Sequence, residues 1–188
     1  MVRSLTLIFC GAFFAATACG DLLLMPRVAE YKGDGVTFKR LEFLDGGKTV
    51  TYESPRGWEF SGTSTQLTLR PPHKLQAEAT ITRVPLSQPG NFDEESLKKL
   101  VSDSVALVPQ GSENISAVSQ EKNRVMIGHK ETFLITLSYT FYGQKYGRSI
   151  LFLNRGNEQI RSQLTCHEAD FEELHRVFLR SQYTWQNL

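Results

Sequence analysis

The sequence predicts an α+β domain in which two main helices pack on a largely antiparallel sheet of about six strands. Three short β-like runs follow one another between residues 133 and 166, separated only by turn residues, which is typical of an antiparallel meander. Apolar residues recur at helical spacing in two other segments, 92–108 and 171–183. A chain of 188 residues is long enough for one such domain with a substantial core.

The first half of the domain is expected to consist of short strands. Residues 36–43 and 48–53 flank Asp45-Gly46-Gly47, a turn sequence whose glycines adopt positive φ without steric cost. Three further β-like runs follow at 58–60, 67–70 and 77–84. Proline residues come directly after the last two of these runs, where they stop the strand.

The segment 92–108 has the apolar spacing of a helix with one buried face. Its apolar positions are Phe92, Leu97, Leu100, Val101, Val105 and Val108. Either Asn91 together with Glu94, or Asp93 alone, is placed to cap the first backbone amides, and Pro109 ends the helix. Residues 111–119 are mostly polar and are expected to form a loop.

The clearest strand signal lies in the second half of the chain. Side chains alternate with a period of two over residues 133–142, which gives this strand one strongly apolar face. Gly143 separates it from a second strand at 146–153, and residues 154–157 form the turn into a third strand at 159–166.

Thiol, imidazole and carboxylate groups are concentrated in the sequence CHEADFEELH, residues 166–175. Cys166 shares the apolar face of the preceding strand, so we expect a buried thiol with a raised pKa rather than a reactive one. Asp170, with Glu173 three residues later, matches a capping box at the start of the closing helix. The carboxylates therefore have a structural role at this position.

A metal site in this segment would have to use Glu172 and His175, which share one helical face. Zinc sites need three or four ligands, and His167 lies before the helix, away from His175. Di-metal bundles need the Glu-x-x-His spacing twice. The segment therefore predicts no metal site, and Glu172 is expected to pair with Arg176 one turn later.

No catalytic constellation is recognisable in the sequence. The motifs G-x-S-x-G, Walker A and G-x-G-x-x-G are missing, and residues 96–99 match S-x-x-K without its companion motifs. We therefore predict no catalytic residue and no cofactor. The alternative is a small envelope hydrolase with His73 or His129 as its base, which requires a carboxylate or nucleophile within hydrogen-bond reach of the imidazole.

The first 20 residues have the layout of a secretory signal peptide. A basic start at Arg3 precedes an apolar run over residues 5–14 and then small residues, and this run is shorter than the roughly 20 residues that span a membrane. Residues 21–34 are expected to form a junction or linker, and residues 35–188 a single α+β domain. The protein is therefore predicted to be exported.

Cys19 is predicted to carry a lipid and to become the first mature residue. Residues 15–18 are small and uncharged, as in a relaxed lipobox, although Ala16 stands where the usual motif has leucine. The alternative is ordinary cleavage after Ala18 or Gly20, which would release a periplasmic or secreted protein. An unmodified Cys19 would be an exposed thiol, which is disfavoured in an oxidising compartment.

The charge balance limits the class of partner. The formal net charge is +1, and apart from Arg3 the basic and acidic residues are equal in number. A nucleic-acid binder needs a basic surface that displaces counterions, so nucleic acid is not an expected partner. The expected partners are a membrane, through the lipid on Cys19, and an envelope protein.

Several features together resemble the PsbP-like superfamily, which includes the photosystem PsbP proteins and the DcrB-type envelope proteins. They are the strand leading into Pro55-Arg56-Gly57-Trp58, the helix 92–108, the meander 131–166, and the closing helix that begins near Asp170-Phe171-Glu172 and ends at Ser181. The resemblance covers residues 48–185. It implies an α/β/α sandwich in an exported and mostly non-catalytic protein, and it carries over no catalytic residue, metal ligand or cofactor.

The function that follows is that of an exported cell-envelope lipoprotein, acting as a non-catalytic binding or assembly and accessory module. Trp58, Tyr142 and Tyr146 are the candidate partner contacts, because aromatic residues in turns make good anchors at interfaces. The alternative for Trp58 is that its large apolar ring fills the core.

Overall fold

The computed structural model describes residues 21–33 and 35–188, and this part of the chain forms ten strands and two helices. The strands are β1 (Leu22–Gly33), β2 (Val36–Asp45), β3 (Lys48–Tyr52), β4 (Glu59–Gly62), β5 (Gln66–Arg70), β6 (Glu78–Pro85), β7 (Glu113–Lys122), β8 (Thr132–Phe141), β9 (Gln144–Arg155) and β10 (Glu158–His167). The helices are α1 (Glu94–Ala106) and α2 (Glu168–Gln182). The fold class is α+β, as the sequence predicts.

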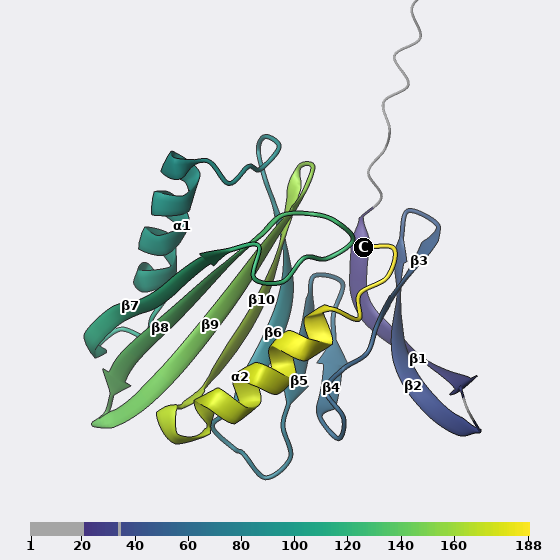
Figure 1. The fold of residues 1–188 in the computed structure, drawn as a ribbon, viewed down its shortest axis with the longest axis horizontal. Helices are drawn as coiled ribbons and strands as arrows, with labels where there is room; N and C mark the ends of the chain where they lie inside the picture. Colours follow the sequence, from purple (N-terminus) through teal and green to yellow (C-terminus); the bar gives the residue numbers. More distant parts are fainter. Residues whose placement is uncertain (1–20, 34) are drawn as a thin grey trace, which may run out of the picture.

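The strands form two antiparallel sheets (Figure 1). A three-stranded sheet has the order β1-β2-β3, and a seven-stranded sheet has the order β4-β5-β6-β10-β9-β8-β7. The consecutive hairpins β8–β9 and β9–β10 are the expected meander and lie in the middle of the larger sheet. The three-stranded sheet lies beside β4, β5 and β6 at the other end of that sheet.

The two helices cover opposite faces of the seven-stranded sheet, so the architecture is the α/β/α sandwich that the PsbP-like resemblance implies. The alternation along β8 separates the two cores: Phe133 and Ile135 pack on the α1 side, whereas Leu134 packs on the α2 side. Figure 1 shows α2 crossing the near face of the larger sheet. The three-stranded sheet contributes to the same core as α2.

The C-terminal residues attach the three-stranded sheet to α2. Tyr52 of β3 stacks on Trp185 with ring centroids 4.5 Å apart, and its hydroxyl lies 2.6 Å from Ser181 Oγ. The backbones of Thr51 and Gln186 exchange two hydrogen bonds. The tail therefore pairs with part of β3, which would otherwise be an open sheet edge.

The expectation of a junction over residues 21–34 is wrong for its described part, because β1 is a full strand of the three-stranded sheet. Leu22 and Leu24 are completely buried, whereas Leu23 and Met25 are exposed. Four adjacent apolar residues conceal this period of two in the sequence. Their assignment to two faces depends on β2, which pairs with β1 from Leu22 to Gly33.

The expected loop over residues 111–119 is also wrong, because most of that segment belongs to β7. This strand is the edge of the larger sheet, and nearly all of its side chains are exposed. A strand with no buried face has no reason to alternate apolar and polar residues, so the sequence carries no strand signal there. Together with β1, this strand accounts for part of the difference between about six expected strands and ten observed ones.

A buried ionic cluster connects the two sheets. The Arg155 guanidinium pairs with Asp45 at the end of β2 and with Glu158 at the start of β10. Arg83 of β6 joins the same cluster, with its Nη1 3.7 Å from Glu158 Oε2 and 2.7 Å from Asp21 Oδ1. The side chains of Arg155, Asp45 and Glu158 are all about nine-tenths buried, so each charge depends on its partners for stabilisation.

The two helices begin in different ways. Asp93 caps α1, since its side chain accepts a hydrogen bond of 2.8 Å from the backbone amide of Ser96. The predicted capping box at Asp170 is wrong, because α2 starts earlier, at Glu168, with His167 as its N-cap residue and no side-chain cap. Within the described residues, neither helix is long and apolar enough to cross a membrane.

Candidate functional site

Trp58 belongs to the core, which favours the alternative that its ring fills the interior. The Trp58 amide donates to the Pro55 carbonyl over 3.1 Å, and Gly57 has a φ of 81°, which closes a tight turn at the Pro55-Arg56-Gly57-Trp58 motif. This turn directs the indole onto Phe178 of α2, with the rings nearly parallel and their centroids 6.4 Å apart. Only 8% of Trp58 is exposed.

The two candidate tyrosines lie at the β8–β9 hairpin and differ in environment. Tyr142 occupies the turn, is 89% exposed and has a φ of 47°. Tyr146 is half-buried, stacks on Tyr139 with centroids 5.5 Å apart, and donates a hydrogen bond of 2.7 Å to Gln76. Tyr142 is therefore available to a partner, whereas Tyr146 already has intramolecular contacts.

The hydrolase alternative requires a partner group for His73 or His129. Both residues are exposed and have positive φ, 60° and 62°, as expected in turns. In the part of the chain that the structure describes, neither imidazole forms a hydrogen bond or an ion pair. The geometry therefore does not provide the acid–base pair that this alternative needs.

The groups of residues 166–175 are dispersed over several environments. Cys166 is completely buried, and burial raises the pKa of its thiol to about 12. Asp170 pairs with Lys74 at 2.5 Å, while His175 stacks on Phe171 and has its pKa lowered by burial. Among the described residues, no three histidine, cysteine or carboxylate side chains are arranged to hold a metal ion. The predicted pair between Glu172 and Arg176 is not formed.

The sequence analysis missed exposed apolar residues on the outer face of the three-stranded sheet, where they lie on either side of the Arg40–Glu42 ion pair. These exposed apolar residues are Leu23, Met25, Val36, Phe38 and Leu44. Leu23 and Leu44 are cross-strand partners, and together with Met25 they line a cavity of 330 Å³. The exposed side of an antiparallel sheet is normally polar, so this outer face is a candidate for partner contact.

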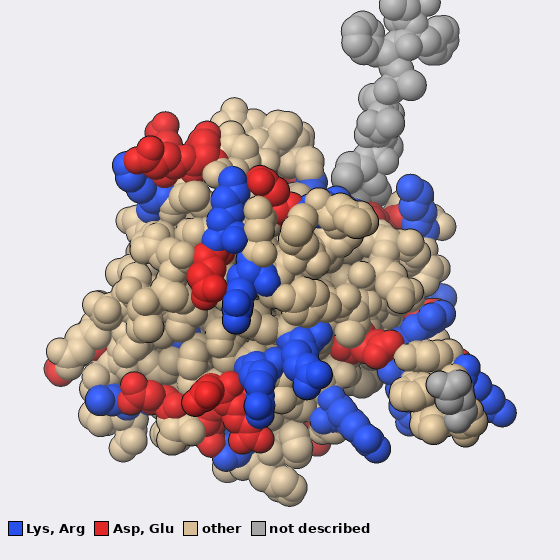
Figure 2. All heavy atoms as spheres, in the orientation of Figure 1, with Lys and Arg blue, Asp and Glu red and all other residues tan. Residues whose placement is uncertain are grey.

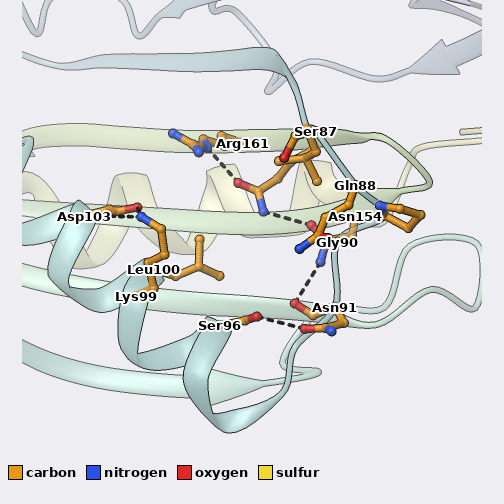
Figure 3. Close-up of a pocket in the computed structure, with 13 residues that line it drawn as sticks. Ser87, Gln88, Gly90, Asn91, Ser96, Lys99, Leu100, Asp103, Asn154 and Arg161 are labelled. Atoms are coloured by element: carbon orange, nitrogen blue, oxygen red, sulfur yellow. Dashed lines mark hydrogen bonds and ion pairs between the residues drawn. The ribbon is translucent and has the colours of Figure 1, made fainter.

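A second candidate is a polar groove of 250 Å³ between α1, the loop before it and strands β9 and β10 (Figure 3). A continuous chain of hydrogen bonds crosses its floor. Arg161 Nε donates to Gln159 over 2.8 Å, Gln159 donates to Asn154 over 2.8 Å, and Asn154 donates to the Asn91 carbonyl over 3.3 Å. Asn91 lies 63 positions before Asn154, so no local motif could have identified the groove.

Charged residues elsewhere on the surface are mixed. In the view of Figure 2, lysine and arginine side chains lie next to aspartate and glutamate side chains, and no uniformly basic stripe crosses this face. Oppositely charged side chains also form ion pairs along α1, where Lys98 pairs with Glu94 and Lys99 pairs with Asp103.

Comparison with solved structures places the chain in the PsbP-like fold. The solution structure of cyanobacterial PsbP (CyanoP) from Synechocystis sp. PCC 6803 is similar with a TM-score of 0.53 and 10% identity, over 96% of this chain and 98% of that chain. LpqN of Mycobacterium tuberculosis, described as involved in cell envelope biogenesis, is similar with a TM-score of 0.52 and 9% identity, over 73% of this chain and 82% of that one. No protein-family model and no curated protein matches the sequence.

Proposed function

We propose that this protein is an exported component of the cell envelope that acts as a non-catalytic binding or accessory module. In this proposal a lipid on Cys19 holds the chain at a membrane, and the outer face of the three-stranded sheet binds a partner protein. The observation that carries the proposal is the group of exposed apolar side chains on that face at Leu23, Met25 and Leu44, because solvent-facing strand positions are normally polar. The PsbP-like fold and the cell-envelope role of LpqN support the same reading.

The position of Cys19 supports a partner at the membrane. Cys19 lies outside the described residues, and it precedes Leu22 of β1 by three positions. Because an extended chain spans at most about 3.6 Å per residue, Leu22 would lie within about 11 Å of the lipidated residue. Leu23 and Met25 would then face a partner that is itself close to the bilayer, while several acyl chains on one cysteine would give stable anchoring.

The anchor is tested by expressing the full-length chain and the Cys19→Ala variant in a bacterium and separating membrane from soluble fractions. We expect the unaltered chain in the membrane fraction with an acylated N-terminal peptide by mass spectrometry, and the variant in the soluble fraction. Equal distribution of both chains, with no acylated peptide, would contradict the anchor.

The outer face is tested by affinity capture from envelope extracts after chemical crosslinking. Met25→Lys introduces a charge into the apolar surface and should strongly reduce recovery of the partner. Val118→Lys on β7 is the matched control, because Val118 is 63% exposed and Met25 is 62% exposed, and it should leave recovery unchanged. The same recovery with both variants would show that the outer face is not the contact surface.

A further inference from the structure

The polar groove beside α1 contains a cation that the fold holds in place but does not neutralise. Arg161 of β10 is half-buried, with its guanidinium carbon 5.8 Å from the centre of the Phe152 ring. Its Nε donates to Gln159, which is 5% exposed and is itself held by Asn154. In the described part of the chain, its two terminal nitrogens form no hydrogen bond and no ion pair.

This arrangement orients the guanidinium before any ligand arrives. The hydrogen bond to Nε and the Phe152 ring fix the plane of the group, so less conformational entropy is lost on binding. Burial also lowers the pKa of Arg161, because water is partly excluded from the charge. A bound anion would offset that cost, since the attraction between opposite charges increases as the surroundings become less polar.

The charges around the groove favour one negative group rather than two. Asp103 of α1 lines the same groove and is near enough to interact with Arg161. Its carboxylate accepts from Lys99 over 2.9 Å, so one lysine, one arginine and one aspartate leave a single positive charge. A doubly charged phosphate would be repelled more strongly by Asp103 and would find fewer donors than it needs.

We propose that this groove binds a small organic acid through its carboxylate, with the terminal nitrogens of Arg161 as the anchor. The planar guanidinium matches a carboxylate with two parallel hydrogen bonds. The volume of 250 Å³ is below the range of pockets for drug-sized ligands, so the acid is small. Asn91, Ser96 and Ser87 supply polar atoms along the remaining wall (Figure 3). This site is distinct from the outer face and does not depend on the proposed partner.

The test is an NMR titration of the mature chain with butyrate, a monocarboxylate, with the neutral amide butyramide and inorganic phosphate as comparison ligands. Butyrate should shift the signals of Arg161 and of residues 86–91, whereas butyramide and phosphate should bind at least about tenfold more weakly. Equal shifts with butyramide would show that the groove does not recognise the charge of the ligand. Binding of phosphate as tight as that of butyrate would contradict the carboxylate class.

Three variants connect the binding to Arg161. Arg161→Gln should weaken butyrate binding about tenfold or more, while Arg180→Gln, at an exposed arginine of α2, should leave it unchanged. Asp103→Asn should tighten binding, because it removes the repelling carboxylate at nearly constant shape. If Arg161→Gln does not fold, Arg161→Lys takes its place as the test variant, since it keeps the charge but loses the bidentate geometry. Unchanged affinity in the Arg161 variant that folds would overturn the proposal.

Discussion

Single residues decide which aromatic side chains are available for binding. Gly57 adopts positive φ, which turns the chain so that Trp58 enters the core against Phe178. In the β8–β9 turn, Tyr142 itself adopts positive φ, and its ring remains in solvent. Both aromatic residues lie in or beside a turn, and the direction of the backbone places Trp58 in the core and Tyr142 in solvent.

The burial of Trp58 predicts a large stability effect for its truncation. Trp58→Ala should lower the free energy of unfolding by about 3–5 kcal/mol, because it leaves a cavity against Phe178, and Trp58→Phe should cost less. Urea denaturation followed by circular dichroism measures both values. If Trp58→Ala retained full stability but lost partner capture, the indole would be a contact residue after all.

Buried acidic protons predict how stability depends on pH. Burial raises the pKa of the Cys166 thiol to about 12 and also raises the pKa of the Tyr52 hydroxyl. The unfolded chain releases these protons near the ordinary values of about 8.5 and 10, so between those values and the folded ones the native state binds more protons. Stability should therefore fall as pH rises above about 9, by at most about 1.4 kcal/mol per pH unit for each group.

The measurement is a series of urea denaturations at increasing pH, in a chain with serine in place of Cys10 and Cys19. Cys166→Ala and Tyr52→Phe should each flatten the decline, although Tyr52→Phe also removes the contact with Ser181. If the free energy of unfolding of both variants fell with pH as steeply as that of the unaltered chain, other groups would cause the effect.

At the scale of the elements, strands that pack in the core are easier to recognise from the sequence than strands at the edge of a sheet. β10 alternates between buried and half-buried side chains from Ser162 onward, and β8 does so from Leu137 to Thr140. β7 has no buried face, and β1 has four adjacent apolar residues, so neither strand shows a simple pattern. Pairing with a neighbouring strand defines both elements.

The two helix starts predict unequal effects of removing similar aspartates. Asp93→Ala should destabilise the protein by about 1 kcal/mol, because the Ser96 amide loses its cap. Asp170→Ala should cost less, since this carboxylate caps no amide and its ion pair with Lys74 is partly exposed. Thermal or urea unfolding of the two single variants gives the comparison, and a larger loss for Asp170→Ala would indicate a capping role in solution.

At the scale of the whole molecule, the two sheets are held together by the core under α2 and by the ionic cluster around Arg155. The cluster joins the end of β2 to the β9–β10 turn, and Arg83 extends it to β6 and to Asp21. Removing one buried member leaves its partners charged and without compensation. The cluster therefore fixes the position of the outer face relative to the sandwich.

Arg155→Met should lower the free energy of unfolding by about 3–5 kcal/mol, because Asp45 and Glu158 lose their common partner. Arg40→Met is the control, since the Arg40–Glu42 pair is more exposed and should contribute less than about 1 kcal/mol. Hydrogen exchange should rise in β2 and β3 of Arg155→Met. Equal losses for the two variants would show that the cluster is not a main connection between the sheets.

The sequence was sufficient for most of the fold and for little of the candidate sites. The meander, both helices and the Asp45-Gly46-Gly47 turn depend on local spacing, and the structure confirms them. The outer face depends on which side of β1 is covered by the core. The groove depends on Arg161 and Asn91, which are 70 positions apart in the sequence and line one cavity only in the folded chain.

The sequence by itself determined the α+β class, the two helices, the central meander and the burial of Cys166, because each follows from periodicity and turn chemistry within about ten residues. Tertiary structure alone decided the direction of Trp58, the role of β1 as a strand, the apolar outer face and the groove at Arg161. The physical reason is that these features depend on burial and on pairing between distant segments. Such contacts form only after the sheets and helices have packed together.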